Sequence, residues 1–127
     1  MKKGILISSL LLILMVLVLI LQLSHSQYKM ENETNKGFIE CKILNKSVSF
    51  TVECQDGDEL EIKLHREKGV FDLIVKDIDN NIIYRGDNME DCQFNIVINA
   101  SGKYEIILHG RRAVGEFQWQ KIESTGR

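Results

Sequence analysis

The fold is decided by the stretch Ser47-Val48-Ser49-Phe50-Thr51-Val52-Glu53-Cys54-Gln55-Asp56-Gly57-Asp58-Glu59-Leu60-Glu61-Ile62-Lys63-Leu64-His65. Apolar and polar side chains alternate on both sides of Asp56-Gly57, which is the period of a β-strand with one buried face. Asp-Gly is a strong turn signal because both residues tolerate a positive φ. The stretch therefore predicts two antiparallel strands joined by a turn, with Val48, Phe50 and Val52 facing inward.

The same alternation continues in both directions from this stretch. Strands are expected over residues 37–44, 47–54, 59–65, 70–77, 82–85, 92–98, 103–109 and 116–122. No segment among them has the helical periodicity that a crossover between parallel strands needs. About eight short strands separated by turns predict an all-β fold, an antiparallel β-sandwich of jelly-roll-like type. Phe50 and Phe94 both occupy inward-facing positions of the alternating pattern, so both are expected in the core of this fold.

The chain begins with an apolar run from Gly4 to Leu23, which has no charge and no proline and follows Lys2-Lys3. A helix of about 20 residues rises about 30 Å, the thickness of a bilayer's hydrocarbon core. The run exceeds the roughly 7–15 apolar residues of a signal peptide. We therefore expect one N-terminal transmembrane helix over residues 1–23 that contacts the lipid bilayer. A cleaved signal remains the alternative, because Ser24-His25-Ser26 offers small residues for cleavage.

The N-terminal apolar run determines the expected location of the protein and the division of the chain. The positive-inside rule keeps the lysines cytoplasmic, so we expect a single-pass protein of the cell membrane with an extracytoplasmic domain, or a secreted protein after cleavage. A polar stalk is expected over residues 24–36, a β-sandwich ectodomain over 37–122 and a polar tail over 123–127.

The charge of the chain bears on its partners. The 127 residues carry a net charge of −2, and without Lys2-Lys3 the rest has 14 basic and 18 acidic residues, a net charge of −4. That balance excludes a basic nucleic-acid-binding face.

The three cysteines, Cys41, Cys54 and Cys92, all fall on the inward parity of their strands. They are either small buried apolar residues or, on an oxidising side of the membrane, candidates for a disulfide that leaves at least one thiol unpaired. Cys41–Cys54 is the local candidate, although a hairpin at Asn45-Lys46 would place Cys41 opposite Phe50. Their wide spacing without a CxxC predicts no metal site.

A candidate ligand site lies at Asp77-Ile78-Asp79-Asn80-Asn81, whose oxygens alternate as in the first half of a calcium loop. Ile82 stands where that loop needs glycine and Asn88 where it needs a bidentate glutamate, so a plain β-turn is favoured. Tyr84 follows the turn and is the best candidate for an exposed ring. The candidate residues for a carbohydrate or calcium are therefore Tyr84, Asp77, Asp79 and Asn81.

The sequence contains no convergent catalytic set. His65 and His109 fall on the outward parity while the cysteines face inward, and no G-x-S-x-G nucleophile turn occurs. We therefore expect a protein that is not an enzyme and holds no cofactor.

Several short motifs occur in a fixed order along the domain. They are Gln55-Asp56-Gly57-Asp58-Glu59-Leu60, Phe71-Asp72-Leu73-Ile74-Val75-Lys76-Asp77-Ile78-Asp79-Asn80-Asn81-Ile82-Ile83-Tyr84, Ala100-Ser101-Gly102-Lys103-Tyr104-Glu105-Ile106-Ile107-Leu108 and Gly115-Glu116-Phe117. This order resembles the bacterial pre-peptidase C-terminal domains and the GOLD (p24-like) domains of secretory-pathway cargo receptors. The resemblance implies a non-catalytic β-sandwich ectodomain that binds or assists another protein. The p24-like proteins carry their membrane span after the domain, whereas here the apolar run comes first, and no functional residue can be carried over.

These observations together predict a membrane-anchored extracytoplasmic β-sandwich that acts as a non-catalytic binding or interaction module at the cell envelope. We expect a protein partner and no nucleic acid. The alternative is a carbohydrate- or calcium-binding module that is secreted after signal cleavage.

Overall fold

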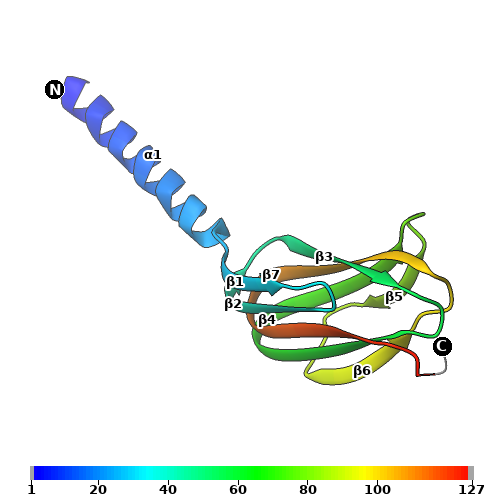
Figure 1. Cartoon of the computed structure of the whole chain (residues 1–127). Helices are drawn as coiled ribbons and strands as arrows, with labels where there is room; N and C mark the ends of the chain where they lie inside the picture. Colours follow the sequence, from blue (N-terminus) through cyan, green and yellow to red (C-terminus); the bar gives the residue numbers. More distant parts are fainter. Residues whose placement is uncertain (1, 126–127) are drawn as a thin grey trace.

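A computed structural model describes the backbone of residues 2–125 and the side chains of residues 7–21 and 25–125. Over these residues, one helix precedes a seven-stranded antiparallel sheet (Figure 1). The elements are α1 (Lys2–Ser24), β1 (Gln27–Asn32), β2 (Lys36–Leu44), β3 (Ser47–Cys54), β4 (Glu59–Asp77), β5 (Ile82–Gly86), β6 (Cys92–Val97) and β7 (Gly102–Ile122). The all-β antiparallel prediction is confirmed for the domain that follows α1.

The two longest strands, β4 and β7, pair along their whole length, from Glu59↔Ile122 at one end to Asp77↔Tyr104 at the other. The first half of β4 and the second half of β7 lie in one layer, in the order β1-β2-β7-β4-β6. The remaining halves lie in a second layer, in the order β3-β7-β4-β5. We call these layer A and layer B. They are two parts of one sheet that folds over on itself where β4 and β7 bend together.

The bend depends on residues that let the two backbones approach closely. Gly69 has a φ of 72°, and a Cβ there would lie 2.1 Å from the carbonyl oxygen of Arg112. A Cβ on Gly115 would lie 2.0 Å from the carbonyl oxygen of His65. Arg112 itself has a φ of 50°, and its backbone N–H donates to Asn45 Oδ1 at 2.6 Å. Side chains at either glycine would push β4 and β7 apart at this point.

The structure therefore joins segments that the sequence pattern separates. Residues 59–65 and 70–77 belong to the single strand β4, and residues 103–109 and 116–122 to the single strand β7. Glycine-containing segments such as 66–69 and 110–115 are typical of loops, but here the glycines permit pairing to continue through the bend. The expectation of about eight short strands is wrong in this respect.

The expected polar stalk contains strand β1, which pairs with β2 from Gln27↔Ile43 to Asn32↔Gly37. Most of its side chains are exposed, because β1 lies at the edge of layer A with little to cover it. Its backbone gains hydrogen bonds while its side chains stay polar, so the sequence shows no apolar alternation there. The polar stalk expected over residues 24–36 thus includes a paired edge strand.

The hairpin expected at Asn45-Lys46 is also wrong, because the chain crosses from layer A to layer B at this point. β2 pairs with the second half of β7 through Leu44↔Ala113, whereas β3 pairs with the first half through Ser47↔His109. Cys41 consequently lies beside Tyr28 and Gly115, and not opposite Phe50.

Helix α1 extends away from the β-domain (Figure 1). Its described apolar side chains, from Ile7 to Leu21, have exposed fractions of 46–68%. Over the part of the chain that the structure describes, no helix has the length and apolarity needed to cross a membrane. The transmembrane helix expected from Gly4 to Leu23 is thus not supported there. The side chains of residues 4–6 and 22–23, and residues 126–127 of the expected tail, lie outside the described part.

The core lies between the two layers and is built from the inward side chains of alternating strands. β3 alternates between exposed and buried along its whole length, as its sequence predicts. Phe50 is 1% exposed, and its ring centroid lies 6.2 Å from that of Phe117 and 6.0 Å from that of Trp119. Phe94 is instead half-buried and packs against Tyr84 at the margin of the core. The expectation that Phe94 is as deeply buried as Phe50 is corrected.

Replacement of these two phenylalanines should have unequal effects on stability. Phe50→Ala should lower the free energy of unfolding by about 3–5 kcal/mol, because it opens a cavity beside two packed aromatic rings. Phe94→Ala should cost at most about 2 kcal/mol, because solvent reaches its site. Chemical denaturation of both variants measures the difference. Equal losses for the two variants would contradict the placement of Phe50 at the centre of the core.

Candidate functional site

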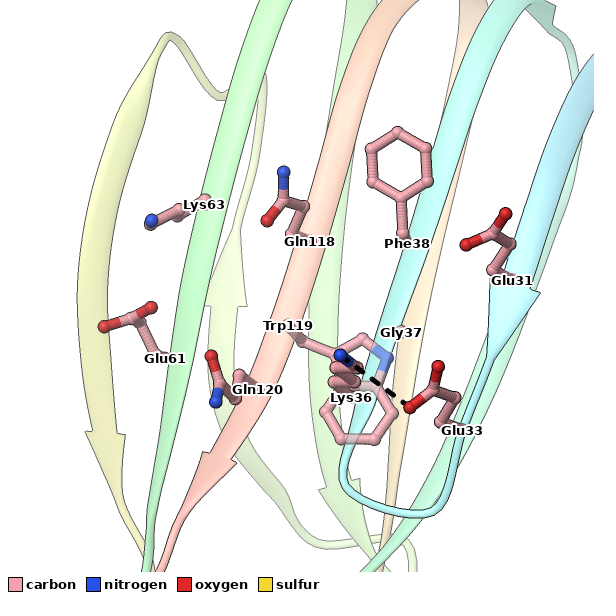
Figure 2. Close-up of a pocket in the computed structure, with 10 residues that line it drawn as sticks. All are labelled: Glu31, Glu33, Lys36, Gly37, Phe38, Glu61, Lys63, Gln118, Trp119 and Gln120. Atoms are coloured by element: carbon pink, nitrogen blue, oxygen red, sulfur yellow. Dashed lines mark ion pairs between the residues drawn. The ribbon is translucent and has the colours of Figure 1, made fainter.

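A groove of about 350 Å³ crosses the outer surface of layer A (Figure 2). Four strands and the β1–β2 turn supply its lining side chains, which are mostly charged groups and amides. We call it the outer groove, and its side chains are Glu31, Glu33, Lys36, Phe38, Glu61, Lys63, Gln118 and Gln120, with Gly37 and Trp119 beneath them. The residues come from distant parts of the sequence and meet only because β7 lies between β2 and β4.

Backbone register arranges these side chains in two rows across the strands. The first row runs Glu31, Phe38, Gln118, Lys63, and the second runs Lys36, Gln120, Glu61. Directly opposite residues in an antiparallel pair have Cβ atoms about 4.5–5.5 Å apart, so each row is a line of neighbouring side chains. Both signs of charge, two amides and one half-buried aromatic ring are thereby presented on a paired backbone.

The floor of the outer groove depends on Gly37. A Cβ at this position would lie 2.1 Å from Nε1 of Trp119, its cross-strand partner. Figure 2 shows the indole ring behind β2 beside Gly37. Trp119 is 1% exposed, and its Nε1 is the one buried side-chain nitrogen or oxygen among the described residues that lacks a hydrogen-bond partner. A buried N–H without an acceptor destabilises a fold by about 1–3 kcal/mol. The domain therefore tolerates an unpaired indole N–H at the base of this groove.

The hollow surface continues from the outer groove toward the bend of β4. A second pocket of about 260 Å³ shares Lys63 and Gln118 with the groove and extends to His65 and Glu116. His65 Nδ1 lies 2.9 Å from Asp91 Oδ2, and the N–H of Arg66 donates to Asp91 Oδ1 at 2.7 Å. These bonds hold the loop before β6 against the bend.

Hydrogen bonding and charge shift the pKa values of this pair in opposite directions. The hydrogen bond that His65 donates to Asp91, together with the negative charge of that carboxylate, raises the pKa of His65. The backbone N–H of Arg66, followed by the His65 side chain, lowers the pKa of Asp91. Each group stabilises the charged form of the other.

The pKa of His65 should respond to removal of this carboxylate. A raised pKa in the folded protein means that the contact adds stability below about pH 6.5, and that this stability is lost as the pH rises through the raised pKa. Asp91→Asn should lower the pKa of His65 toward its ordinary value in an NMR titration. The charge-matched control Asp79→Asn should leave it unchanged. An unaltered His65 pKa in Asp91→Asn would contradict the assigned cause.

The acidic residues expected to bind a ligand lie in the β4–β5 turn, where Asp77 has a clear structural role. Asp77 Oδ1 accepts hydrogen bonds from the backbone N–H groups of Asp79 and Asn81, both at 2.9 Å, and its Oδ2 accepts from the Asn81 amide at 3.1 Å. These bonds, chiefly that from the Asn81 backbone, lower the pKa of Asp77. Asn80 takes a φ of 64°, as a tight turn requires. The carboxylate of Asp77 therefore stabilises the β4–β5 turn.

Tyr84 lies on β5, where it faces Val75 across the β4–β5 pair. Its ring centroid is 4.8 Å from that of Phe94, and burial raises the pKa of its hydroxyl. The ring is thus half-buried and not fully presented to solvent. Among the described residues, no group of three or more histidine, cysteine or acidic side chains could hold a metal ion. A ligand at Tyr84, Asp77, Asp79 and Asn81 stays a prediction.

All three cysteines are free thiols in this structure. Burial raises the pKa of Cys41 to about 11, and burial likewise raises the pKa of Cys54 and Cys92. A thiol is a nucleophile only when it is ionised, so these side chains are poorly reactive near neutral pH.

A serine and a histidine do meet on the exposed surface of layer B. Ser47 Oγ lies 2.9 Å from His109 Nδ1, and Asp72 occupies the opposite position on β4. The carboxylate of Asp72, however, accepts the N–H of Asn88 at 2.8 Å and lies 3.5 Å from Arg111 Nη2. The acid is therefore engaged by two other groups, and we interpret the Ser47–His109 contact as a cross-strand surface pair.

Comparison with known proteins gives no family assignment. No family model matches the chain, and no curated protein matches it by sequence. Similar solved structures include a periplasmic inhibitor of g-type lysozyme from Aeromonas hydrophila, with 16% identity and a TM-score of 0.48 over 76% of this chain and 88% of that chain. The pre-peptidase C-terminal domain of a collagenase from Bacillus anthracis has 13% identity and a TM-score of 0.46 over 76% and 89%. The enzymatically active domain of bacteriophage CBA120 tailspike protein 4 has 12% identity and a TM-score of 0.36 over 76% and 17%.

The collagenase domain belongs to one of the two groups that the sequence resembles. TM-scores below 0.5 at such identities do not place the chain in that family.

Sequence reasoning missed the outer groove. Phe38 could have been noticed, because it is an aromatic residue on the outward parity of a strand whose inward side is already apolar. Gln118 and Gln120 likewise alternate with the inward Phe117 and Trp119. The sequence could not show that β7 places Gln118 between Phe38 and Lys63, and Gln120 between Lys36 and Glu61.

Proposed function

We propose that this protein is a non-catalytic binding module that acts outside the cytoplasm and holds a polypeptide partner in the outer groove of layer A. The observation that carries the proposal is the pair of cross-strand rows in that groove. Each row combines one hydrogen-bonding amide with charges of both signs, and one row adds the ring of Phe38.

The chemistry of the rows suits a polypeptide. Gln118 and Gln120 each offer both a donor and an acceptor, which match backbone amide groups. Lys63 and Glu61 lie two residues apart on β4 and can pair with side chains of opposite charge. Phe38 supplies the apolar contact that typically anchors an interface. The central position of β7 and β4 in layer A holds these groups in place before binding, which reduces the entropy cost of association.

The location outside the cytoplasm is proposed from the sequence. The apolar run that follows Lys2-Lys3 favours export of the domain by the positive-inside rule. The proposal holds both for a run that stays attached at the membrane and for one that is cleaved.

The non-catalytic part of the proposal is supported by the state of the reactive groups. The thiols of Cys41, Cys54 and Cys92 have raised pKa values. Asp72 is bonded to Asn88 and close to Arg111, so it does not complete a set with Ser47 and His109.

A carbohydrate is the second candidate ligand for the same groove. The observation that favours it is the position of Phe38 in one row between Glu31 and Gln118. An aromatic ring flanked by hydrogen-bonding side chains can stack on a sugar ring while its neighbours bond the hydroxyls.

Site-specific photocrosslinking in the native host tests the proposal. A photoreactive residue in place of Gln118 should give a discrete product, whereas one in place of Thr51, an exposed residue of β3 in layer B, should not. Phe38→Ala should weaken the crosslink about 30-fold, the effect of removing one central anchor worth about 2 kcal/mol. The control Ile83→Ala, which removes an exposed apolar side chain from layer B, should leave it intact.

The nature of the product separates the two candidates. A product that proteases degrade to partner peptides supports the polypeptide, and one that carries sugar supports the carbohydrate. Equal crosslinking from positions 118 and 51, or a product unaffected by Phe38→Ala in a protein with unchanged melting temperature, would overturn the outer groove as the binding site.

A further inference from the structure

Strand β1 forms one edge of layer A, and over the described residues no strand pairs with its outer side. The N–H of Glu33 donates to the carbonyl of Lys36 at 2.8 Å, so these two residues form a hydrogen-bonded pair at the β1–β2 turn. Hydrogen-bonded and open pairs alternate along an antiparallel ladder, and Glu31 and Lys29 therefore also bond to β2. The backbone N–H and C=O groups of the residues between them point toward the free edge, and these residues are Tyr28, Met30 and Asn32.

The side chains on this edge are exposed and alternate in character. Lys29 and Glu31 lie on the outer face of layer A, opposite Glu40 and Phe38 of β2. Met30 lies between them on the other face and is 42% exposed. Among the described residues, neither Lys29 nor Glu31 has an ion-pair partner. The edge thus presents opposite charges two residues apart, with an apolar side chain between them.

The chemistry of a strand that fits this edge follows from the pairing rules. An antiparallel strand runs in the reverse direction, so it needs a basic residue beside Glu31, then an apolar one beside Met30, then an acidic one beside Lys29. The chain carries this order, basic, apolar and acidic, in β1 itself, as Lys29-Met30-Glu31. Strand β1 is therefore complementary to a second copy of itself.

We propose that two copies of this chain associate through their β1 strands, which pair antiparallel about a two-fold axis at Met30. Lys29 of each copy lies beside Glu31 of the other, so the two charge pairs are reciprocal. The backbone agrees with this register, because Met30 faces Met30 and Tyr28 faces Asn32, and all three residues point their N–H and C=O groups toward the free edge. The charge pairs then occupy the open positions of the ladder, where side chains approach most closely.

The pairing also extends the outer groove. The first row of one copy ends at Glu31, and Lys29 of the second copy becomes its next member. The five strands of layer A from each copy form one ten-stranded sheet. Both outer faces point the same way, because the two-fold axis is perpendicular to the sheet. The association needs no ligand in the groove, so it and the proposed function can fail independently.

The geometry sets the strength of the dimer and the form of the protein that makes it. Residues 28–32 of each copy take part, so the contact is small and the dimer is expected to be weak. The paired strands run in opposite directions, and the two α1 helices therefore leave at opposite ends. This arrangement favours the form from which the apolar run has been cleaved.

Disulfide trapping of the protein, as its native host exports it, tests the proposal. Met30→Cys places a thiol on the two-fold axis, where the Cα atoms of a hydrogen-bonded pair lie about 5.5 Å apart, within the range that a disulfide spans. Mild oxidation should link this variant into a dimer and into nothing larger. Ile83→Cys replaces an apolar side chain of β5 with a similar exposure of 39%, and should stay monomeric like the parent.

Charge reversal tests the register. Lys29→Glu and Glu31→Lys, each combined with Met30→Cys, should each weaken the pairing about 30-fold, because two attractive pairs become repulsive. The two variants should link to each other when they are expressed together, since one edge is then acidic and the other basic. Lys103→Glu, combined with Met30→Cys in the same way, reverses a charge at an exposed site of β7 and should leave the dimer intact.

Several results would overturn the proposal. They are equal linking through positions 30 and 83, products larger than a dimer, and capture of another polypeptide at position 30 in place of a second copy. Equal dimer yields from Lys29→Glu and Lys103→Glu would exclude the register. If the charge variants fail to fold, the salt dependence of Met30→Cys decides. Its dimer should decrease at about 1 M salt, where the Debye length is about 3 Å, and an unchanged yield counts against the charge pairs.

Discussion

Backbone pairing between β4 and β7 is the interaction on which the rest of the structure depends. The two strands stay paired from Glu59↔Ile122 to Asp77↔Tyr104, and every other strand of layers A and B, apart from the edge strand β1, is attached to one of them. Because both strands bend at the same place, one sheet supplies both faces of the core. The close approach at Gly69 and Gly115 makes this bend sterically feasible.

The outer groove, to which we assign the binding role, is a direct consequence of this pairing. The outer groove exists because β7 separates β2 from β4 and aligns Phe38, Gln118 and Lys63 in one row.

Much of the fold could be predicted from local pattern, and the rest required long-range pairing. The alternation from Val48 to Cys54 gives the strand and its buried face correctly, since both depend on adjacent residues. The continuity of β4 through Gly69 could not be predicted, because glycine marks loops far more often than bends. β1 was missed because an edge strand needs no apolar side chains. The outer groove was missed because its residues are brought together only by register between distant strands.

Native-state hydrogen exchange across β4 and β7 tests the central claim most directly. If the paired strands hold both layers together, the slowest amides of residues 60–64 and 116–119 in layer A should open with the same free energy as those of residues 71–75 and 106–108 in layer B. They should also share one dependence on denaturant concentration, because one cooperative unfolding event exposes them all. Separate opening free energies for the two layers would show that the bend divides the domain, and would contradict the account.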